Sequence, residues 1–447
     1  MHPSEVHTTL GKCMLADGES IVVDLEHSHG SYLVDSLTGT EYLDFFSYFA
    51  SMPIGHNHPK MHDPAFLEKL TIAALSKPSS SDFYTTFMAE FVATFQRVAM
   101  PDSMKHLFLI SGGGLAVENA LKVAFDWKFR HNLNLLHRHA GVKWQYSIEG
   151  LGSKIIHFQQ AFHGRTGYTL SLTNTADPRK HMHFPKFDWP RVVNPKLRFP
   201  ITEEVLEEVK RTEEIAITQI EAAVRQYPGD IAALIIEPIQ GEGGDNHFRP
   251  EFFRELRRLA DKHEFLFIAD EVQSGMGMTG KMWAIEHADT LPDVIAFGKK
   301  AQVCGVIAGP RIDEVNGHVF EESSRINSTF GGNLVDMVRA TRYLEIIEED
   351  HLVDNAAKMG TRLTDGLLKI TEGSKGMLSN VRGKGLMIAF DLPNDEKRQE
   401  MINNLRENKL YAIKCGCQSI RFRPMLDVTP EDIDKALEII EKSVPQH

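Results

Sequence analysis

The sequence predicts an α/β protein that has a central, mostly parallel sheet in a large domain and a smaller α+β domain beside it. Between about residues 105 and 300, short apolar runs alternate with longer stretches of helical periodicity, a pattern typical of parallel strands covered by helices. Beyond about residue 330 the pattern changes to helices mixed with strand-like segments. We therefore expect an N-terminal segment 1–63 that contributes to the small domain, a large domain 64–330 and a C-terminal small domain 331–447.

Composition and charge exclude several kinds of protein. The 447 residues include 49 Lys and Arg against 61 Asp and Glu, a formal net charge of −12, so a nucleic-acid-binding surface, which needs a basic face, is not expected. No apolar run approaches the ~18 residues of a membrane span, and the polar N-terminus does not resemble a signal peptide. The cysteines and the His-x-His pairs lack the spacing of a metal site. We expect a cytoplasmic protein that binds no membrane, nucleic acid or metal.

The first hundred residues predict a strand region followed by helices. Residues 20–50 alternate between apolar and polar side chains, which indicates strands with a turn at residues 37–40. Residues 64–100 have helical patterning, and a lysine, a proline and serines interrupt it at residues 77–81.

The next unit combines a strand, glycines and a helix. An apolar run at residues 106–110 leads into Gly112, Gly113 and Gly114 and then into a helical pattern. This arrangement presents backbone N–H groups and a helix N-terminus to a phosphate. A plain glycine turn explains the stretch equally well, because glycine is common in turns. Residues 126–153 are irregular and basic and predict an excursion before the next strand.

The strand predicted at residues 154–158 leads to Phe162, His163 and Arg165. An aromatic face can stack on a flat cofactor, and an arginine can hold a carboxylate through two hydrogen bonds. The alternative is a core phenylalanine and a surface arginine. A long amphipathic helix is expected after Thr202, whose hydroxyl can cap it.

Two further apolar strands end in acids. The first is followed by Glu237 and by a glycine loop that carries Glu242. The helix predicted at residues 251–263 separates it from the second strand, which ends in Asp270 and Glu271.

A third apolar run ends at Gly298 and is followed by Lys299 and Lys300. The carboxyl ends of parallel strands share one edge of a sheet, so an acid and an amine are expected to meet there. A lysine that forms an imine and an acid that pairs with the ring nitrogen are the groups that hold pyridoxal phosphate. The residues alone do not rank Lys299 above Lys300.

The C-terminal part predicts a helical stretch at residues 334–371, a strand region at 383–392 and strand-like residues at 411–423. A final helix is expected after Thr429, with Pro430 at its first position.

Seven stretches in this order closely resemble the class III (ω-) aminotransferases, which have fold type I and use pyridoxal phosphate, and the resemblance covers nearly the whole chain. They are SGGGLAVENALK, AFHGRTGYTLSLTNT, IIEPIQGEGG, FIADEVQSGMGMTG, DVIAFGKK, RINSTFGGN and SIRFRP. The family's separation between aspartate and lysine is 29 residues, and 299 − 270 is 29, which favours Lys299 over Lys300.

The resemblance implies a role for individual residues. Lys299 would bind the cofactor covalently and move a proton, and Asp270 would keep the ring nitrogen protonated. Further cofactor contacts are implied for Gly113, Gly114, Phe162, Glu237, Gln273 and, from a second subunit, Thr329. The last contact implies a homodimer with shared active sites. Glu237 has a structural alternative, since many strand-end acids serve only in ion pairs.

Within this family, VENALKVAFDWK, GYTLSLTNT and KKAQVCGV resemble the branch that acts on the terminal amine of L-lysine. The implied reaction passes that amino group to 2-oxoglutarate and gives 2-aminoadipate 6-semialdehyde and L-glutamate, a step of lysine catabolism. Arg165 would bind a distal carboxylate, Arg421 would bind the α-carboxylate of the oxo acid, and Glu242 would pair with Arg421 when the amine is bound. Asn327 is a further candidate for substrate binding.

Three alternatives stay open. The nearest is another ω-aminotransferase that acts on ornithine, acetylornithine, 4-aminobutyrate or a diamine. The second is an aminomutase or racemase of the same fold, which needs no amino acceptor. The third is a binding protein that keeps the fold without the chemistry, which the intact Lys299 and Asp270 disfavour.

Overall fold

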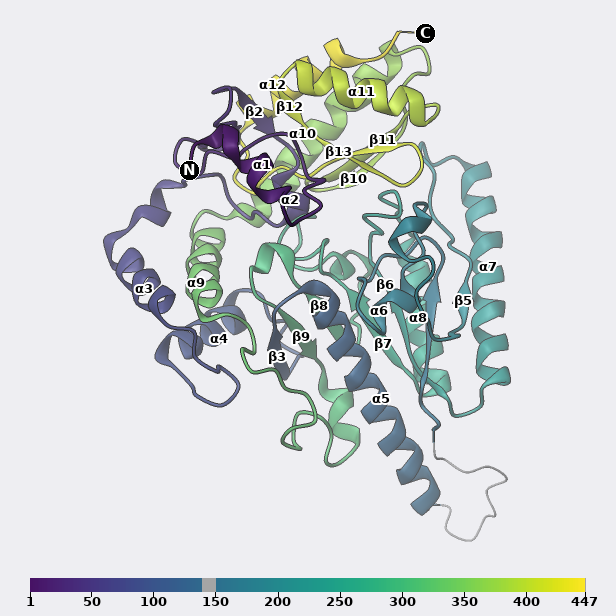
Figure 1. The fold of residues 1–447 in the computed structure, drawn as a ribbon. Helices are drawn as coiled ribbons and strands as arrows, with labels where there is room; N and C mark the ends of the chain where they lie inside the picture. The colour runs from purple at the N-terminus through teal and green to yellow at the C-terminus, as the bar shows by residue number, and fades with distance from the viewer. Residues whose placement is uncertain (139–149, 447) are drawn as a thin grey trace.

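The computed structural model describes residues 1–138 and 150–446 and is organised around a seven-stranded sheet (Figure 1). The strands are β3 (His106–Ile110), β4 (Lys154–Phe158), β5 (Arg191–Val192), β6 (Ile231–Ile236), β7 (Leu266–Asp270), β8 (Val294–Phe297) and β9 (Cys304–Ala308). They lie in the order β3-β9-β8-β7-β6-β4-β5. Strands β4 to β8 pair in parallel, and β9 is antiparallel to β3 and to β8. The prediction of a mostly parallel central sheet is confirmed.

Helices cover both faces of this sheet, and each face has its own core. The main covering helices are α5 (Gly113–Arg138), α7 (Glu203–Gln226) and α8 (Pro250–His263). On one face Val117 of α5 belongs to the same core as Ile235 of β6. On the other face Leu256 of α8 shares a core with Leu234, the preceding residue of β6. Successive strand residues therefore point into opposite cores, which explains why β6 is apolar without interruption.

A four-stranded antiparallel sheet lies at the top of Figure 1, beside the central sheet. Its strands are β10 (Ser379–Lys384), β11 (Met387–Asp391), β13 (Ile413–Cys415) and β14 (Ser419–Phe422), in the order β10-β11-β14-β13. The helices of this part are α10 (Leu352–Gly373), α11 (Asp395–Glu407) and α12 (Pro430–Ser443). Buried residues from these elements form one further core.

The N-terminal strands join this C-terminal part. A three-stranded sheet contains β1 (Tyr32–Val34), β2 (Glu41–Asp44) and β12 (Leu410–Tyr411). Strand β2 pairs in parallel with β12, where Leu43 lies opposite Leu410. The domain boundaries at residues 63 and 330 stay a prediction.

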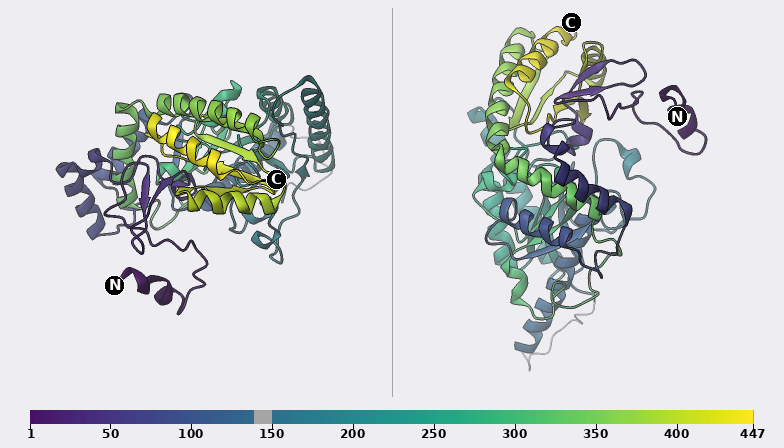
Figure 2. Two further views of the ribbon diagram at one scale, coloured as in Figure 1. Left: turned by 90° about the horizontal axis from the view of Figure 1, so that it is seen from above. Right: turned by 90° about the vertical axis from the view of Figure 1, so that its left-hand side faces the viewer.

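The remaining helices are α1 (Val6–Leu10), α2 (Ser47–Ala50), α3 (Pro64–Leu75), α4 (Thr86–Val98), α6 (Thr169–Leu172) and α9 (Leu334–Glu349). Helices α3 and α4 pack beside α9, whereas α1 stands away from the rest of the chain in both views of Figure 2. In the described ranges, no helix combines the length and the apolar character that crossing a membrane requires.

The helix caps predicted from the sequence are present. The Thr202 hydroxyl accepts a hydrogen bond from the backbone N–H of Val205 at 3.3 Å, at the start of α7. At the start of α12 the Thr429 hydroxyl accepts from the N–H of Asp432 at 3.1 Å, and the Asp432 carboxylate accepts from the N–H of Thr429 at 3.3 Å. This reciprocal capping box satisfies two backbone donors at the helix end.

Helix α5 is longer than the sequence predicts. The irregular excursion expected over residues 126–153 is wrong for residues 126–138, which continue the helix, and residues 139–149 lie outside the described residues. The indole N–H of Trp127 donates to the backbone carbonyl of Arg311 at 3.0 Å. Tertiary contacts of this kind stabilise helical residues whose sequence pattern is weak.

The structure adds detail to one predicted strand region and differs from another. The strand region predicted at residues 383–392 contains the end of β10 and the whole of β11, and a tight turn at Gly385, whose φ is +51°, separates the two strands. The strand character expected up to residue 50 ends earlier. Residues Ser47–Ala50, the element labelled α2, instead form a single left-handed turn in which all four φ angles are positive, from +42° to +68°. The Asp44 carboxylate supports this turn by accepting from the N–H of Ser47 at 2.7 Å.

Candidate active site

The strand ends that the sequence singles out surround one cavity of about 170 Å³ at the carboxyl ends of β6, β7 and β8. Its lining consists of Gly113, Gly114, Phe162, His163, Gly164, Glu237, Glu242, Asp270, Val272, Gln273 and Lys299. A larger cavity of about 470 Å³, lined in part by Lys196 and Arg382, contains none of the predicted catalytic residues. Chemistry and not size therefore identifies the candidate active site.

Asp270, the last residue of β7, is buried and held by two donors. One carboxylate oxygen lies 2.7 Å from Nδ1 of His163, and the other accepts from the N–H of Val272 at 3.0 Å. Burial alone would lower the pKa of His163, but the hydrogen bond to Asp270 and the charge of that carboxylate outweigh burial and raise it. A carboxylate fixed in this way can pair with a protonated ring nitrogen. Sequence reasoning gave His163 no role, and its only signal is its position directly after Phe162.

The two adjacent lysines have different surroundings. Lys299 lines the cavity, and burial together with Arg421 lowers the pKa of its amine, although Asp270 opposes the shift. Lys300 is 2% exposed, and its ammonium nitrogen donates to the backbone carbonyls of Ala50 at 3.0 Å and Met52 at 3.2 Å. Only Lys299 is thus available to a molecule in the cavity.

The glycines before α5 leave room for a phosphate. Gly112 has a φ of +109°, which turns the chain from β3 into the helix, and the first two residues of α5 are Gly113 and Gly114. A Cβ atom at residue 113 would lie 2.7 Å from Cγ1 of Val272, so a side chain there would collide with the cavity wall. Helix N-termini with free backbone N–H groups bind phosphates. Together with Lys299 and Asp270, these residues fit pyridoxal phosphate.

Phe162 and Glu237 are linked at the cavity wall. The Glu237 carboxylate accepts from the N–H of Phe162 at 2.8 Å and from the N–H of Gly241 at 3.1 Å. Burial raises the pKa of Glu237 to about 7, and the nearby His163 opposes this rise. Glu237 therefore ties the loop after β4 to the loop after β6 and so positions the aromatic ring beside the cavity.

Arg421 and Glu242 form an ion pair at the edge of the cavity. A guanidinium N–H of Arg421, a residue that is 1% exposed, donates to Glu242 at 2.7 Å. The other carboxylate oxygen of Glu242 accepts from the ammonium of Lys180, a residue that the sequence analysis did not single out. Burial would raise the pKa of Glu242, but Arg421 and Lys180 outweigh burial and lower it. Arg421 also donates to Oε1 of Gln273 at 3.3 Å.

Four predicted site residues are not among those that line the cavity. Arg421 is one of them and reaches the cavity wall through its contacts with Glu242 and Gln273. Arg165 is exposed, and its guanidinium carbon lies 5.7 Å from the ring centre of Phe162. Asn327 and Thr329 are exposed in the loop before α9. The structure therefore brings the predicted cofactor residues together except Thr329, and of the predicted substrate residues it joins only Glu242 and Arg421.

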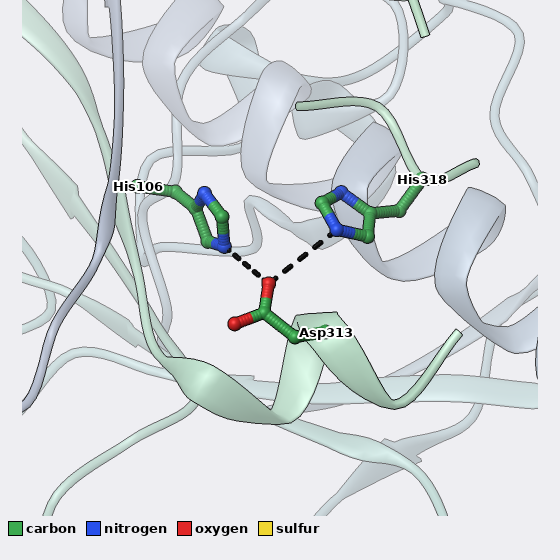
Figure 3. Close-up of side chains that lie close together, drawn as sticks. All are labelled: His106, Asp313 and His318. Carbon is green, nitrogen blue, oxygen red and sulfur yellow. Dashed lines mark hydrogen bonds and ion pairs between the residues drawn. The ribbon is translucent and has the colours of Figure 1, made fainter. Parts of the chain in front are cut away.

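One cluster away from the cavity has the side chains of a metal site (Figure 3). Nε2 of His106 lies 2.6 Å from Oδ1 of Asp313, and Nε2 of His318 lies 3.4 Å from the same oxygen. Nδ1 of His318 accepts from the N–H of Phe320 at 3.3 Å, so Nε2 of this ring carries a proton and offers no lone pair to a metal. Lys105 donates to the other Asp313 oxygen at 3.2 Å. We interpret the cluster as a carboxylate that is neutralised by its donors.

Comparisons with known proteins agree with this geometry. A family model described as aminotransferase class-III matches residues 14–444. The chain is 48% identical over 445 residues to the L-lysine-epsilon aminotransferase of Mycobacterium tuberculosis, covering 99% of this chain and 96% of that protein. It is 48% identical over 442 residues to the protein of the same name from Amycolatopsis lactamdurans, covering 98% and 95%.

Solved structures agree as well. Lysine aminotransferase from M. tuberculosis in the internal aldimine form has a TM-score of 0.94 at 47% identity, covering 100% of this chain and 99% of that one. The family match, the identity over the full length and the shared fold lead to one conclusion. This chain belongs to the class III aminotransferases, which are pyridoxal-phosphate-dependent enzymes of fold type I.

Proposed function

We propose that this enzyme transfers the ε-amino group of L-lysine to 2-oxoglutarate and forms 2-aminoadipate 6-semialdehyde and L-glutamate. The observation that carries the proposal is the Arg421–Glu242 ion pair beside Lys299. This pair lets one cavity accept an amine that has no carboxylate next to its reacting amino group and also an oxo acid that has a carboxylate next to its oxo group. The names of the relatives at 48% identity support L-lysine as the amine donor.

Lys299 is the proposed proton carrier. When bound, pyridoxal phosphate supplies two things: a carbon atom whose bond to one amine can be exchanged for a bond to another, and a ring that accepts electrons. The lowered pKa of Lys299 leaves more of its amine neutral, as a nucleophile and a base require. In each half-reaction its Nζ atom would move one proton between the reacting carbon of the cofactor and the substrate carbon that bears the amino group, which is the ε-carbon of L-lysine in the first half and the α-carbon of L-glutamate in the second.

Two cavity residues, each held by a neighbour, are proposed to orient the cofactor. Asp270 would keep the ring nitrogen protonated, and its hydrogen bond with His163 fixes the carboxylate for that purpose. Phe162 would stack on one ring face, where its backbone is held by Glu237.

Glu242 is proposed to change partners during the two half-reactions. With L-lysine bound, it pairs with Arg421, as in the structure. With 2-oxoglutarate bound, Arg421 would hold the α-carboxylate of the oxo acid, and Lys180 would keep Glu242 paired. This arrangement avoids a buried, unpaired charge in either state, which costs about 3–5 kcal/mol when a buried pair is broken. Arg165 is proposed to bind the distal carboxylate of either substrate.

A homodimer with shared active sites is part of the proposal. Thr329 and Asn327 are exposed and do not line the cavity of their own chain, which supports a role in the cavity of a second copy. The hydroxyl of Ser81 donates to the backbone carbonyl of Thr329 at 3.4 Å. Close to Ser81 in the chain, Phe83 is 72% and Tyr84 is 80% exposed, an apolar surface that a partner subunit would cover.

The experiment that tests the proposal is a half-reaction with a panel of amines, followed by the absorbance of the bound cofactor. L-lysine should convert the cofactor to its amine form faster than ornithine, acetylornithine, 4-aminobutyrate or a diamine, and 2-oxoglutarate should reverse the change. A faster reaction with another amine would replace L-lysine in the proposal. Turnover without 2-oxoglutarate would favour a mutase or racemase. The proposed location is the cytoplasm, where the four free thiols would stay reduced.

A further inference from the structure

A second arginine–carboxylate pair lies directly behind the active site. Arg423 follows β14 two residues after Arg421, and Asp245 follows Glu242 in the loop after β6. Arg423 and Asp245 are both 0% exposed, and neither lines the cavity. Two parallel N–H···O contacts of 2.8 Å and 2.5 Å join them, a bidentate arrangement. Strand β14 with the residue after it, and the loop after β6, therefore carry two pairs, one that borders the cavity and one that is fully enclosed.

Every N–H of the Arg423 guanidinium has an acceptor. Two N–H groups reach Asp245, and one reaches the backbone carbonyl of Phe422 at 2.9 Å. The other two donate to Oε1 of Gln273, from Nε at 3.2 Å and from Nη2 at 3.0 Å. A guanidinium has five N–H donors, so none is left over and the group is locked. A lysine could not reproduce this planar set of contacts.

These contacts determine which way the Gln273 amide points. Its oxygen accepts from Arg423 and, at 3.3 Å, from Arg421. The reversed amide would place its NH2 group against guanidinium N–H groups, which is unfavourable because donors would face donors. Gly241 permits the close passage of this side chain, because a Cβ atom at residue 241 would lie 2.3 Å from Oε1 of Gln273. The NH2 group of Gln273 is therefore left for the cavity that this residue lines.

We propose that the Asp245–Arg423 pair is a positioning unit that holds Gln273 with its NH2 group toward the cofactor. Neither residue touches the cofactor cavity, so both act through Gln273. The pair also explains how Gln273 can stay in place while Arg421 changes partners: Arg423 supplies two of the three donors to the amide oxygen, and these do not depend on the substrate. The cofactor would thus keep the same donor in both half-reactions.

The test is a double-mutant cycle read from the pH titration of cofactor absorbance in the purified holoenzyme. The variants are Gln273→Ala, the neutral pair Asp245→Asn with Arg423→Gln, and the combination of all three. Changing both members of the pair avoids a buried, unpaired charge. Each of the first two proteins should shift the titration midpoint by about one pH unit, the size of one lost hydrogen bond. The triple variant should shift it no further, because the pair acts only through Gln273.

The control is Glu213→Gln, which weakens a bidentate pair with Arg249 at 2.8 Å and 2.9 Å away from the cavity. This control variant should leave the midpoint of the titration unchanged. A shifted midpoint in the control would mean that a general loss of stability moves the titration. Additive shifts in the triple variant, or an unchanged midpoint in a folded pair variant, would overturn the proposal.

A second variant covers the case in which the pair variant does not fold. Gln273→Glu keeps an oxygen for the arginines but presents an oxygen in place of NH2 to the cavity. It should move the midpoint at least as far as Gln273→Ala, and a titration like that of the unmodified enzyme would overturn the inferred orientation. The inference requires the cofactor in this cavity but not L-lysine as donor, so a negative result in the amine panel leaves it standing.

Discussion

Replacing Lys180 with methionine should slow one half-reaction and spare the other. In the amine half, Glu242 keeps Arg421 as its partner at 2.7 Å, so the loss of Lys180 leaves the carboxylate paired. In the oxo-acid half, Arg421 is expected to turn to the substrate, and without Lys180 the Glu242 carboxylate has no cation beside it. The free-energy cost therefore falls on the complex with 2-oxoglutarate.

The size of the effect follows from how far the pair is buried. The side chains of Lys180 and Glu242 are 21% and 22% exposed, so the pair lies between a surface ion pair and a fully enclosed one. Exposed pairs contribute about 0–1 kcal/mol, and breaking a fully buried pair costs about 3–5 kcal/mol. After allowance for solvent screening, we expect about 1–2 kcal/mol, which is roughly a 5- to 30-fold fall in kcat/KM for 2-oxoglutarate.

Stopped-flow absorbance of the cofactor measures the two half-reactions separately, starting from the two forms of the enzyme. The matched control is Arg179→Met, because Arg179 is the neighbouring residue but is 84% exposed, and among the described residues its ion pair is with Asp177. That variant should react like the unmodified enzyme in both halves. Equal losses in both halves for Lys180→Met, or no loss in either, would refute the exchange of partners at Glu242.

Lys299→Ala should abolish turnover and the absorbance band of covalently bound cofactor. Lys300→Met should keep that band, because of the two lysines only Lys299 lines the cavity. The reverse result would assign the covalent bond to Lys300. Burial lowers the pKa of Lys300 to about 7, so between pH 7 and 10 the unfolded chain binds more protons than the folded chain. The unfolding free energy of the unmodified enzyme should therefore rise with pH relative to that of Lys300→Met, by up to about 1.4 kcal/mol per pH unit. Urea titrations measure this difference, and a difference that does not change with pH would contradict the argument. Gly360→Ala should destabilise the enzyme by about 1–3 kcal/mol, because the new Cβ atom would lie 2.0 Å from the carbonyl oxygen of Gly385. Gly373→Ala is the control: residue 373 is in the same helix but has open space around it, so this variant should not lower the melting temperature. Equal melting temperatures for the two variants would contradict the packing argument.

The central sheet could be predicted because both of its faces are covered. Strands buried on two sides are apolar without interruption, and their carboxyl ends carry Glu237, Asp270 and Lys299 at one edge. The cofactor residues that line the cavity could be placed for the same reason, since each lies at the carboxyl end of a strand or within a few residues of it.

Contacts between distant parts of the chain could not be predicted. Lys180 stands in the short 3-10 helix Pro178–Lys180, with no sequence signal that connects it to Glu242. The surroundings of Lys300 depend on carbonyls about 250 residues earlier in the chain, which no local pattern reveals. The C-terminal half of α5 was missed because its helical state depends on tertiary partners such as Arg311.

The left-handed turn at Ser47–Ala50 places backbone strain in one region of the fold. A left-handed conformation costs about 1–2 kcal/mol per residue with a side chain, so four such residues carry a strain close to the stability of many whole proteins. The carbonyl of Ala50 is bound by Lys300, the neighbour of the lysine in the cavity, so opening of the turn would release the backbone beside that lysine. Phe49 is 54% exposed, and glycine or asparagine would adopt its backbone angles with less strain. Replacing Phe49 with glycine or asparagine could therefore make the enzyme more resistant to heat. Phe49 is far from the catalytic groups in the sequence but is connected to them through Ala50 and Lys300.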